Sequence, residues 1–145
     1  MRPFLTGTVF TLIAVLALSC HNDQPADVSK IMADSAHYTT IAWLDSLSRN
    51  YGTIIEGEKL NVTFRFRNIG SSPLVIGHVQ PSCGCTIAEQ PQGAIAPGKE
   101  GQIRATFNSQ GRTGVNHKTL FVTANTRGVQ NYSLQFVVQV DKKPS

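Results

Sequence analysis

Side-chain polarity alternates with a period of two over most of the chain after residue 38. In the segment 60–67 every second residue is apolar, from Leu60 to Phe66, and the residues between them are Asn, Thr or Arg. A β-strand directs successive side chains to opposite faces, so this pattern predicts a strand with one buried face and one solvated face. The same alternation returns in segments 103–107 and 134–140. It therefore favours antiparallel sheets that bury one face each.

Turn residues divide the rest of the chain into further short segments of strand character. These segments are 40–44, 52–55, 74–79, 86–89 and 120–124, separated by Gly- and Pro-containing turns at 68–73, 91–93, 97–98 and 111–114. Strands recurring about every 8–12 residues, without helical segments between them, are typical of an all-β sandwich or small barrel. We expect about seven to eight antiparallel strands, with Trp43 as an aromatic residue of the core.

The first nineteen residues have the architecture of a secretory signal peptide. Arg2 is the only charged residue before the apolar segment 9–18, and the small residue Ser19 precedes Cys20. About ten apolar residues span about 15 Å as a helix, half of a hydrocarbon core of about 30 Å. A permanent transmembrane helix is therefore disfavoured, and we expect residues 1–19 to be removed.

Residues 17–20, Ala-Leu-Ser-Cys, resemble a bacterial lipobox. The resemblance implies that Cys20 is lipidated and begins the mature chain, which several acyl groups then hold on the membrane. The alternative is an ordinary signal peptide that leaves Cys20 as a free thiol. We expect residues 20–38 to form the lipidated N-terminus, a tether and a helical turn, and residues 142–145 to form a polar tail. His21 is not acidic, which favours the outer over the inner membrane, with the domain in the periplasm or at the cell surface.

The charge distribution argues against nucleic acid as a partner. The formal net charge is +4, from 13 Lys and Arg residues against 9 Asp and Glu. The basic residues are scattered, and no run of five like charges occurs.

Cys83-Gly84-Cys85 is the constellation that stands out chemically. Both sulfurs point to the same side of a strand, with Cα atoms about 6.6 Å apart when fully extended, and Gly84 permits the bend that a disulfide needs. Such a bond closes a three-residue loop and stabilises the fold by only about 1.6 kcal/mol. Three interpretations follow: a structural bridge or corner, a redox pair, or a soft-metal site for Cu(I) with His78 or His117 as a further ligand.

Motifs of familiar enzymes do not occur. The sequence has no Gly-x-Ser-x-Gly, no His-Glu-x-x-His and no phosphate-binding glycine loop. A cysteine nucleophile needs a base, and no residue can be assigned that role. We therefore expect a protein that is not an enzyme and has no cofactor.

An ordered series of short motifs resembles the family called domain of unknown function 1573. The motifs, in chain order, are Tyr51–Ile54, Glu56–Glu58, Phe64-x-Phe66-x-Asn68-x-Gly70, Pro73–Leu74, Cys83–Thr86 and Ile95–Gly98. The resemblance implies an immunoglobulin-like β-sandwich over residues 39–141, similar to cilium-associated and major-sperm-protein domains. It also implies a secreted or lipid-anchored protein of Bacteroidetes or related bacteria, of unassigned activity.

Together these features predict a lipid-anchored cell-envelope protein. We expect its single immunoglobulin-like domain to act as a non-enzymatic binding or structural module, with the membrane and a protein or peptide as partners. The alternative is a thiol-redox or copper-binding protein that uses Cys83 and Cys85.

Overall fold

The computed structural model describes residues 28–144. The predicted signal peptide, Cys20 and the first part of the tether lie outside these residues. No helix within the described residues is both long and apolar enough to span a bilayer.

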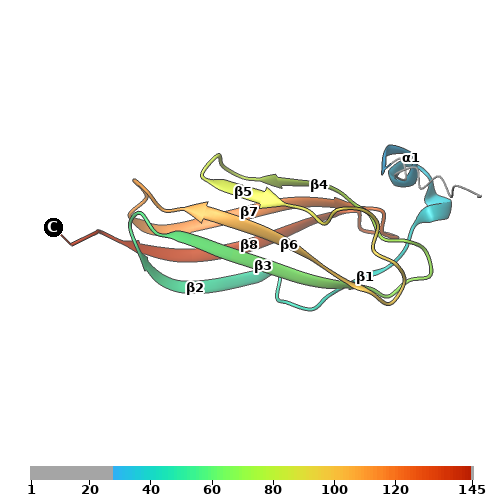
Figure 1. The fold of residues 1–145 in the computed structure, drawn as a ribbon, viewed down its shortest axis with the longest axis horizontal. Helices are drawn as coiled ribbons and strands as arrows, with labels where there is room; N and C mark the ends of the chain where they lie inside the picture. Colours follow the sequence, from blue (N-terminus) through green and yellow to red (C-terminus); the bar gives the residue numbers. More distant parts are fainter. Residues whose placement is uncertain (1–27, 145) are drawn as a thin grey trace, which may run out of the picture.

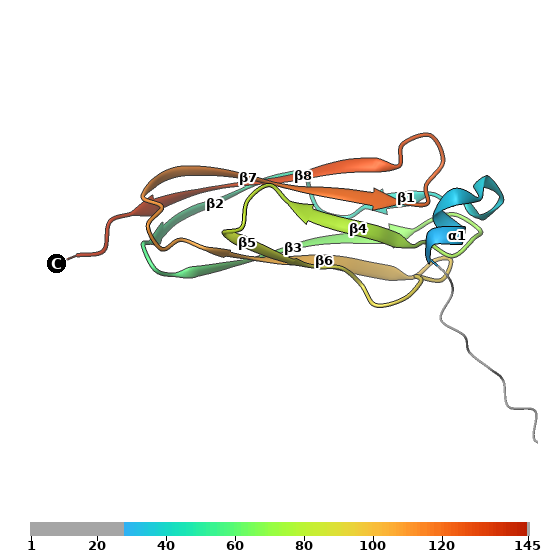
Figure 2. The ribbon, with the colours of Figure 1, turned by 90° about the horizontal axis from the view of Figure 1, so that it is seen from above.

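Eight strands form two four-stranded sheets packed face to face, as predicted (Figures 1 and 2). The first sheet has the order β1-β3-β6-β5 and the second the order β2-β8-β7-β4. The strand bounds are β1 Ile41–Trp43, β2 Ser48–Ile55, β3 Lys59–Asn68, β4 Ile76–Pro81, β5 Thr86–Glu89, β6 Glu100–Asn108, β7 Gly114–Ala124 and β8 Asn131–Asp141.

One strand pair differs from the expected antiparallel arrangement. Strand β2 runs parallel to β8, with Ser48 opposite Gln135 and Ile55 opposite Asp141, whereas the other pairs of named strands are antiparallel. The cause lies in the loop 44–47, which carries the chain from the first sheet to the second without reversing its direction. The alternation of polar and apolar side chains predicts where strands form, but it does not show that the chain changes sheet between β1 and β2.

Strand β7 also begins earlier than predicted, at Gly114 rather than near residue 120. Lys118 stands in the inward-facing row that continues with Leu120 and Val122, opposite Phe136 of β8. Its ammonium nitrogen lies 5.3 Å from the centroid of the Phe107 ring. The aliphatic stem of a lysine can cover apolar surface while its charged end stays near solvent, so the strand continues where the polarity pattern breaks.

The core lies between the sheets and consists of the inward-facing residues. Its largest fully buried side chains are Phe64, Phe66, Phe107, Phe136, Leu74, Ile103, Leu120 and Leu134. Trp43 packs edge-on against Phe66 of its own sheet and Tyr132 of the other, with ring centroids 5.6 and 5.4 Å away. Within the described residues its indole N–H is buried without a hydrogen-bond partner.

A short helical segment lies at the end of the sandwich remote from the C-terminus (Figures 1 and 2). It consists of α1, Val28–Ala33, and the 3-10 turn η1, Ser35–His37. Met32 of α1 lies beside Gly77 of β4 and Thr123 of β7, since a methyl group added at Gly77 would sit 3.1 Å from its sulfur. We call this end of the molecule the α1 pole.

Two buried asparagines tie the loops of the α1 pole together. The Asn68 side chain donates to the carbonyls of Ser72 and Ile95, and its oxygen accepts from Thr39. The Asn125 side chain donates to the carbonyls of His37 and Pro73 and accepts from the amide of Val75. These hydrogen bonds replace the ladder where the strands end, because buried backbone groups need partners.

Candidate functional site

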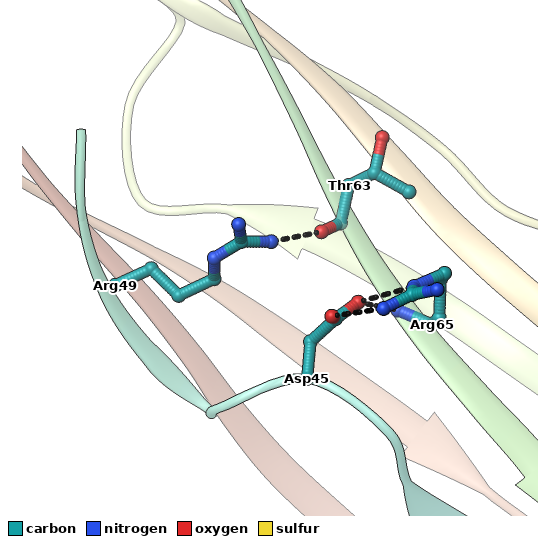
Figure 3. Close-up of polar contacts among 4 residues, drawn as sticks. All are labelled: Asp45, Arg49, Thr63 and Arg65. Carbon is teal, nitrogen blue, oxygen red and sulfur yellow. Dashed lines mark hydrogen bonds and ion pairs between the residues drawn. The ribbon is translucent and has the colours of Figure 1, made fainter.

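The two flanks of the sandwich, where the sheets meet edge to edge, are built differently. On one flank the chain passes from β1 to β2, and the loop 44–47 lies against the exposed edge of β3. The carboxylate of Asp45 accepts from the backbone N–H of Arg65 at 2.8 Å and from its guanidinium at 2.8 and 3.1 Å (Figure 3). Leu44 donates its N–H to the carbonyl of Arg65 at 2.9 Å. This flank is closed by polar side chains.

Electrostatics reinforce that closure. Hydrogen bonds from the Arg65 side chain lower the pKa of Asp45 from 3.8 to about 2, against the opposing effect of burial. The same carboxylate raises the pKa of Arg65. Arg49 of β2 donates to the carbonyl of Thr63 at 3.1 Å, on the part of β3 that β1 does not reach (Figure 3). Charged side chains of this kind protect a sheet edge from further strand pairing.

The opposite flank is open because β4 and β5 belong to different sheets and do not pair with each other. Strand β5 hydrogen-bonds only to β6, with Ile87 opposite Thr106 and Ala88 opposite Ala105, in the described part of the chain. The amide of Asn108 donates to the carbonyl of Cys85, so Cys85 is hydrogen-bonded to β6. In an antiparallel pair every second residue bonds to the partner strand, so Ile87 is the next residue of β5 that does so. The carbonyl of Thr86 and both backbone groups of Ala88 therefore point away from β6, toward the open flank.

A groove follows this open edge. It has a volume of about 1000 Å³ and is bounded by β4, by the end of β5 with the loop after it, and by the outer face of β3 and β6. Val79, Ala88 and Pro91 provide its apolar part. The residues that line it are Arg65, His78, Val79, Ala88, Glu89, Gln90, Pro91, Gln92, Glu100, Gly101, Gln102 and Arg104.

Ile87 is the most exposed large apolar side chain of the described residues, at 70%. It projects from the outer face of β5 between two hollows of about 300 and 90 Å³. The larger hollow is also lined by Lys59 and Arg112, and the smaller by Arg104 and Glu89. An exposed isoleucine on an unpaired edge, with cations around it, is a surface that a second chain can use. Ile87 does not stand out in the sequence, because the short segment 86–89 does not show which alternate residues face inward.

Cys83 and Cys85 form a disulfide, with Cα atoms 5.3 Å apart. Cys85 is buried in the core and Cys83 packs against it while remaining partly exposed. Both sulfurs lie within 4 Å of the Thr86 hydroxyl, at 3.8 and 3.9 Å. Ser82 exchanges two hydrogen bonds with Thr119 of β7, which holds the same turn against the second sheet. The disulfide thus fixes the start of β5, the strand that borders the open flank.

The proposed ligands of a soft metal are not brought together. Among the described residues, no three His, Cys, Asp or Glu side chains are grouped so as to hold a metal ion. The Nε2 atom of His78 lies 3.0 Å from the side-chain oxygen of Gln80, and His117 is an exposed residue of β7. Since the disulfide occupies both sulfurs, it leaves no thiolate for copper.

Among the described residues near this turn, Lys118 is the one cation whose side chain lies partly between the two sheets. Burial lowers its pKa, and the positive charge of Arg112 lowers it further. Its position over Phe107 is a cation–π contact. We assign it a packing role at the base of the flank.

The fold defines a class: an immunoglobulin-like β-sandwich. One similar structure is the ASH/PapD-like domain 7 of human CEP192, with a TM-score of 0.60 and 12% identity over 97% of this chain and 100% of that one. Another is the periplasmic chaperone SfaE, with a TM-score of 0.51 and 13% identity over 73% and 61% of the two chains. At these identities the likeness concerns the fold alone.

The family follows from the sequence. Residues 43–140 match the model described as "Protein of unknown function (DUF1573)", and the chain belongs to this family. A protein of unknown function from Porphyromonas gingivalis W83 has a similar structure, with a TM-score of 0.62 and 15% identity. The match covers 73% of this chain and 49% of that protein, so this chain spans about half of its length. No curated protein matches the chain.

Proposed function

We propose that this protein is a lipid-anchored, non-enzymatic binding module of the cell envelope, which holds an extended segment of a partner protein against strand β5. The observation that carries this proposal is the contrast between the two flanks. The edge of β3 is covered by Asp45 and Arg49, whereas β5 keeps unpaired backbone groups beside a groove and an exposed Ile87.

The chemistry of the flank specifies the kind of segment that it would hold. The outward-pointing backbone groups of Thr86 and Ala88 suit a strand added to the sheet edge. Ile87 and Ala88 offer apolar contacts on the two faces of that added strand, where alternate side chains would lie. Lys59, Arg104 and Arg112 outnumber Glu89 around Ile87. The proposed partner segment is therefore extended, with apolar residues at alternate positions and acidic residues at its flanks.

The anchor is supported by the sequence around Cys20, which lies outside the described residues. Residues 17–20 resemble a lipobox, and the apolar segment before them is too short for a permanent span. Intact-mass analysis of the protein from its native envelope tests this part. Acyl groups on a chain that begins at Cys20 support it, and a chain with an unmodified Cys20 refutes it.

Proline at position 88 tests the binding site. The Ala88 N–H points away from β6, so Ala88→Pro removes the edge donor while leaving the ladder with β6 intact. Decapeptides selected from a display library on the purified protein serve as probes. We expect Ala88→Pro to reduce their binding at least about tenfold, the effect of about 1.4 kcal/mol, with little change in unfolding temperature. Ile87→Pro removes an N–H that the ladder uses, and we expect it to lower stability instead.

A side-chain pair provides the matched control. Ile87→Ser and Val115→Ser each remove one exposed β-branched side chain, on different sheets. Only Ile87→Ser should weaken the selected peptides. Undiminished binding to both Ala88→Pro and Ile87→Ser would show that the partner segment does not use β5.

A thiol-redox role is the second candidate, favoured by the partly exposed Cys83 and by the small loop that its disulfide closes. A three-residue loop gains only about 1.6 kcal/mol from cross-linking, so stability alone is a weak reason for this bond. The reduction potential of the pair decides the matter. A value below about −300 mV, where structural disulfides lie, removes the redox role.

A further inference from the structure

We infer that the α1 pole of the sandwich rests on an anionic lipid surface, so that the domain stands on the membrane with its C-terminal end outward. This inference rests on the proposed anchor at Cys20, and it adds an orientation and a lipid-contacting surface to it.

Chain length limits which end can reach the membrane. Eight peptide units separate Cys20 from Val28 and reach at most about 29 Å when fully extended. The chain enters the domain at α1, and Met32 packs beside Gly77, which holds α1 against the sandwich. Strand β8 alone, with its 11 residues, is about 35 Å long and leads from the α1 pole to the C-terminal end (Figure 1). Because the tether is shorter than the sandwich, the C-terminal end cannot touch the bilayer in an orientation that turns the α1 pole away from the membrane.

The α1 pole carries two exposed apolar side chains on neighbouring loops. Ile69 is 58% exposed and Val129 is 56% exposed. Their loops lie on either side of the segment 39–40: the Ile69 N–H donates to the carbonyl of Thr40, and the Arg127 N–H donates to that of Thr39. Backbone hydrogen bonds thus hold both loops in fixed positions at the tip of the molecule.

Cations accompany these apolar residues. Lys99 and Arg127 are exposed on the loops of this pole, and no carboxylate among the described residues pairs with either. Of the described acidic side chains near this pole, Asp34 pairs with His37 and Glu100 pairs with Arg67. Exposed apolar side chains beside unpaired cations suit an interface with anionic headgroups.

Hydrogen–deuterium exchange of the lipidated full chain tests the orientation. The protein is measured in vesicles of phosphatidylethanolamine with one-quarter phosphatidylglycerol, in phosphatidylcholine vesicles, and in detergent. We expect peptides that contain residues 69–72 and 126–130 to exchange more slowly in the anionic vesicles only. Peptides from the opposite end, residues 56–58 and 110–113, should exchange equally in all three.

Charge variants give the matched comparison. Lys99→Gln with Arg127→Gln removes two cations from the α1 pole and should shift the docked equilibrium by about 30-fold, the effect of about 2 kcal/mol. Lys142→Gln with Lys143→Gln removes two exposed cations at the C-terminal end, remote from that pole, and should change nothing. Both double variants should remain in the vesicle fraction, because the lipid holds them there.

Three results would overturn the inference. Equal exchange in anionic vesicles and detergent would mean that the domain moves freely on its tether. Slow exchange of the opposite end would place that end on the membrane. Concentration-dependent protection of the α1 pole in detergent would show that a second copy covers it. If intact mass shows Cys20 unmodified, the anchor proposal fails separately, and coupling the free thiol to a maleimide lipid restores the same tether for this test.

Discussion

Replacing Asp45 by Asn should remove the charge that closes the β1–β2 flank. The lowering of its pKa from 3.8 to about 2 corresponds to an upper bound of about 2.5 kcal/mol. The Arg65 side chain is 58% exposed while that of Asp45 is 13% exposed, so solvent screening reduces the expected loss to about 1 kcal/mol at neutral pH.

The pH dependence of this loss has a definite sign. A carboxyl group whose pKa is lower in the folded state stabilises the fold above its unfolded pKa, here 3.8. That contribution disappears as the pH falls from 3.8 through about 2. The wild-type protein and Asp45→Asn should therefore differ by about 1 kcal/mol at pH 7, by clearly less at pH 2.5, and converge as the pH falls below about 2.

Urea unfolding followed by circular dichroism measures this difference at both pH values. With an m-value of about 1.5 kcal/mol/M, the midpoint of the variant should fall by about 0.7 M at pH 7. Glu100→Gln is the control, because it removes an ion pair in which both side chains are about half exposed and should cost at most about 0.5 kcal/mol. The same penalty for Asp45→Asn at pH 7 and pH 2.5 would refute the assignment of its stabilising effect to charge.

Three further predictions concern packing, buried polar groups and the disulfide. Gly101→Ala adds a methyl group 2.5 Å from a buried aromatic ring and should lower the free energy of unfolding by about 1–3 kcal/mol; Gly84→Ala meets no atom within 4 Å and should have little effect in the same urea titration. Asn125→Ala leaves three backbone groups of the α1-pole loops without their partner, and calorimetry should show a loss of about 3 kcal/mol. Reduction of the Cys83–Cys85 disulfide should cost about 1.6 kcal/mol, and a loss above about 3 kcal/mol would show that the bond supports more than its own loop.

Much of the fold could be predicted from the sequence, because the alternation of residues 60–67 and 134–140 requires strands with one buried face. The direction of β2 could not be predicted. It depends on where the loop 44–47 crosses between sheets, and side-chain polarity carries no record of which sheet a strand joins. The early start of β7 was missed for a related reason, since Lys118 occupies an inward position that its stem and a cation–π contact make tolerable.

The candidate site was predictable only in part. Cys83 and Cys85 stand out in the sequence, and the structure joins them in a disulfide at the start of β5. The exposed Ile87 and the unpaired groups of Ala88 are consequences of sheet order, which places β5 at an edge. A four-residue segment has too few alternations to show whether Thr86 or Ile87 faces the core. Asn68 and Asn125 were likewise not identified as buried, because their partners are backbone groups of distant loops.

Trp43 gives the molecule an internal optical probe. The chain contains one tryptophan, and its ring contacts Phe66 from the first sheet and Tyr132 from the second. Its emission therefore reports whether the two layers remain in contact at that place, independently of how much strand persists. If the layers separate before the strands dissolve, fluorescence will change at a lower denaturant concentration than far-ultraviolet dichroism.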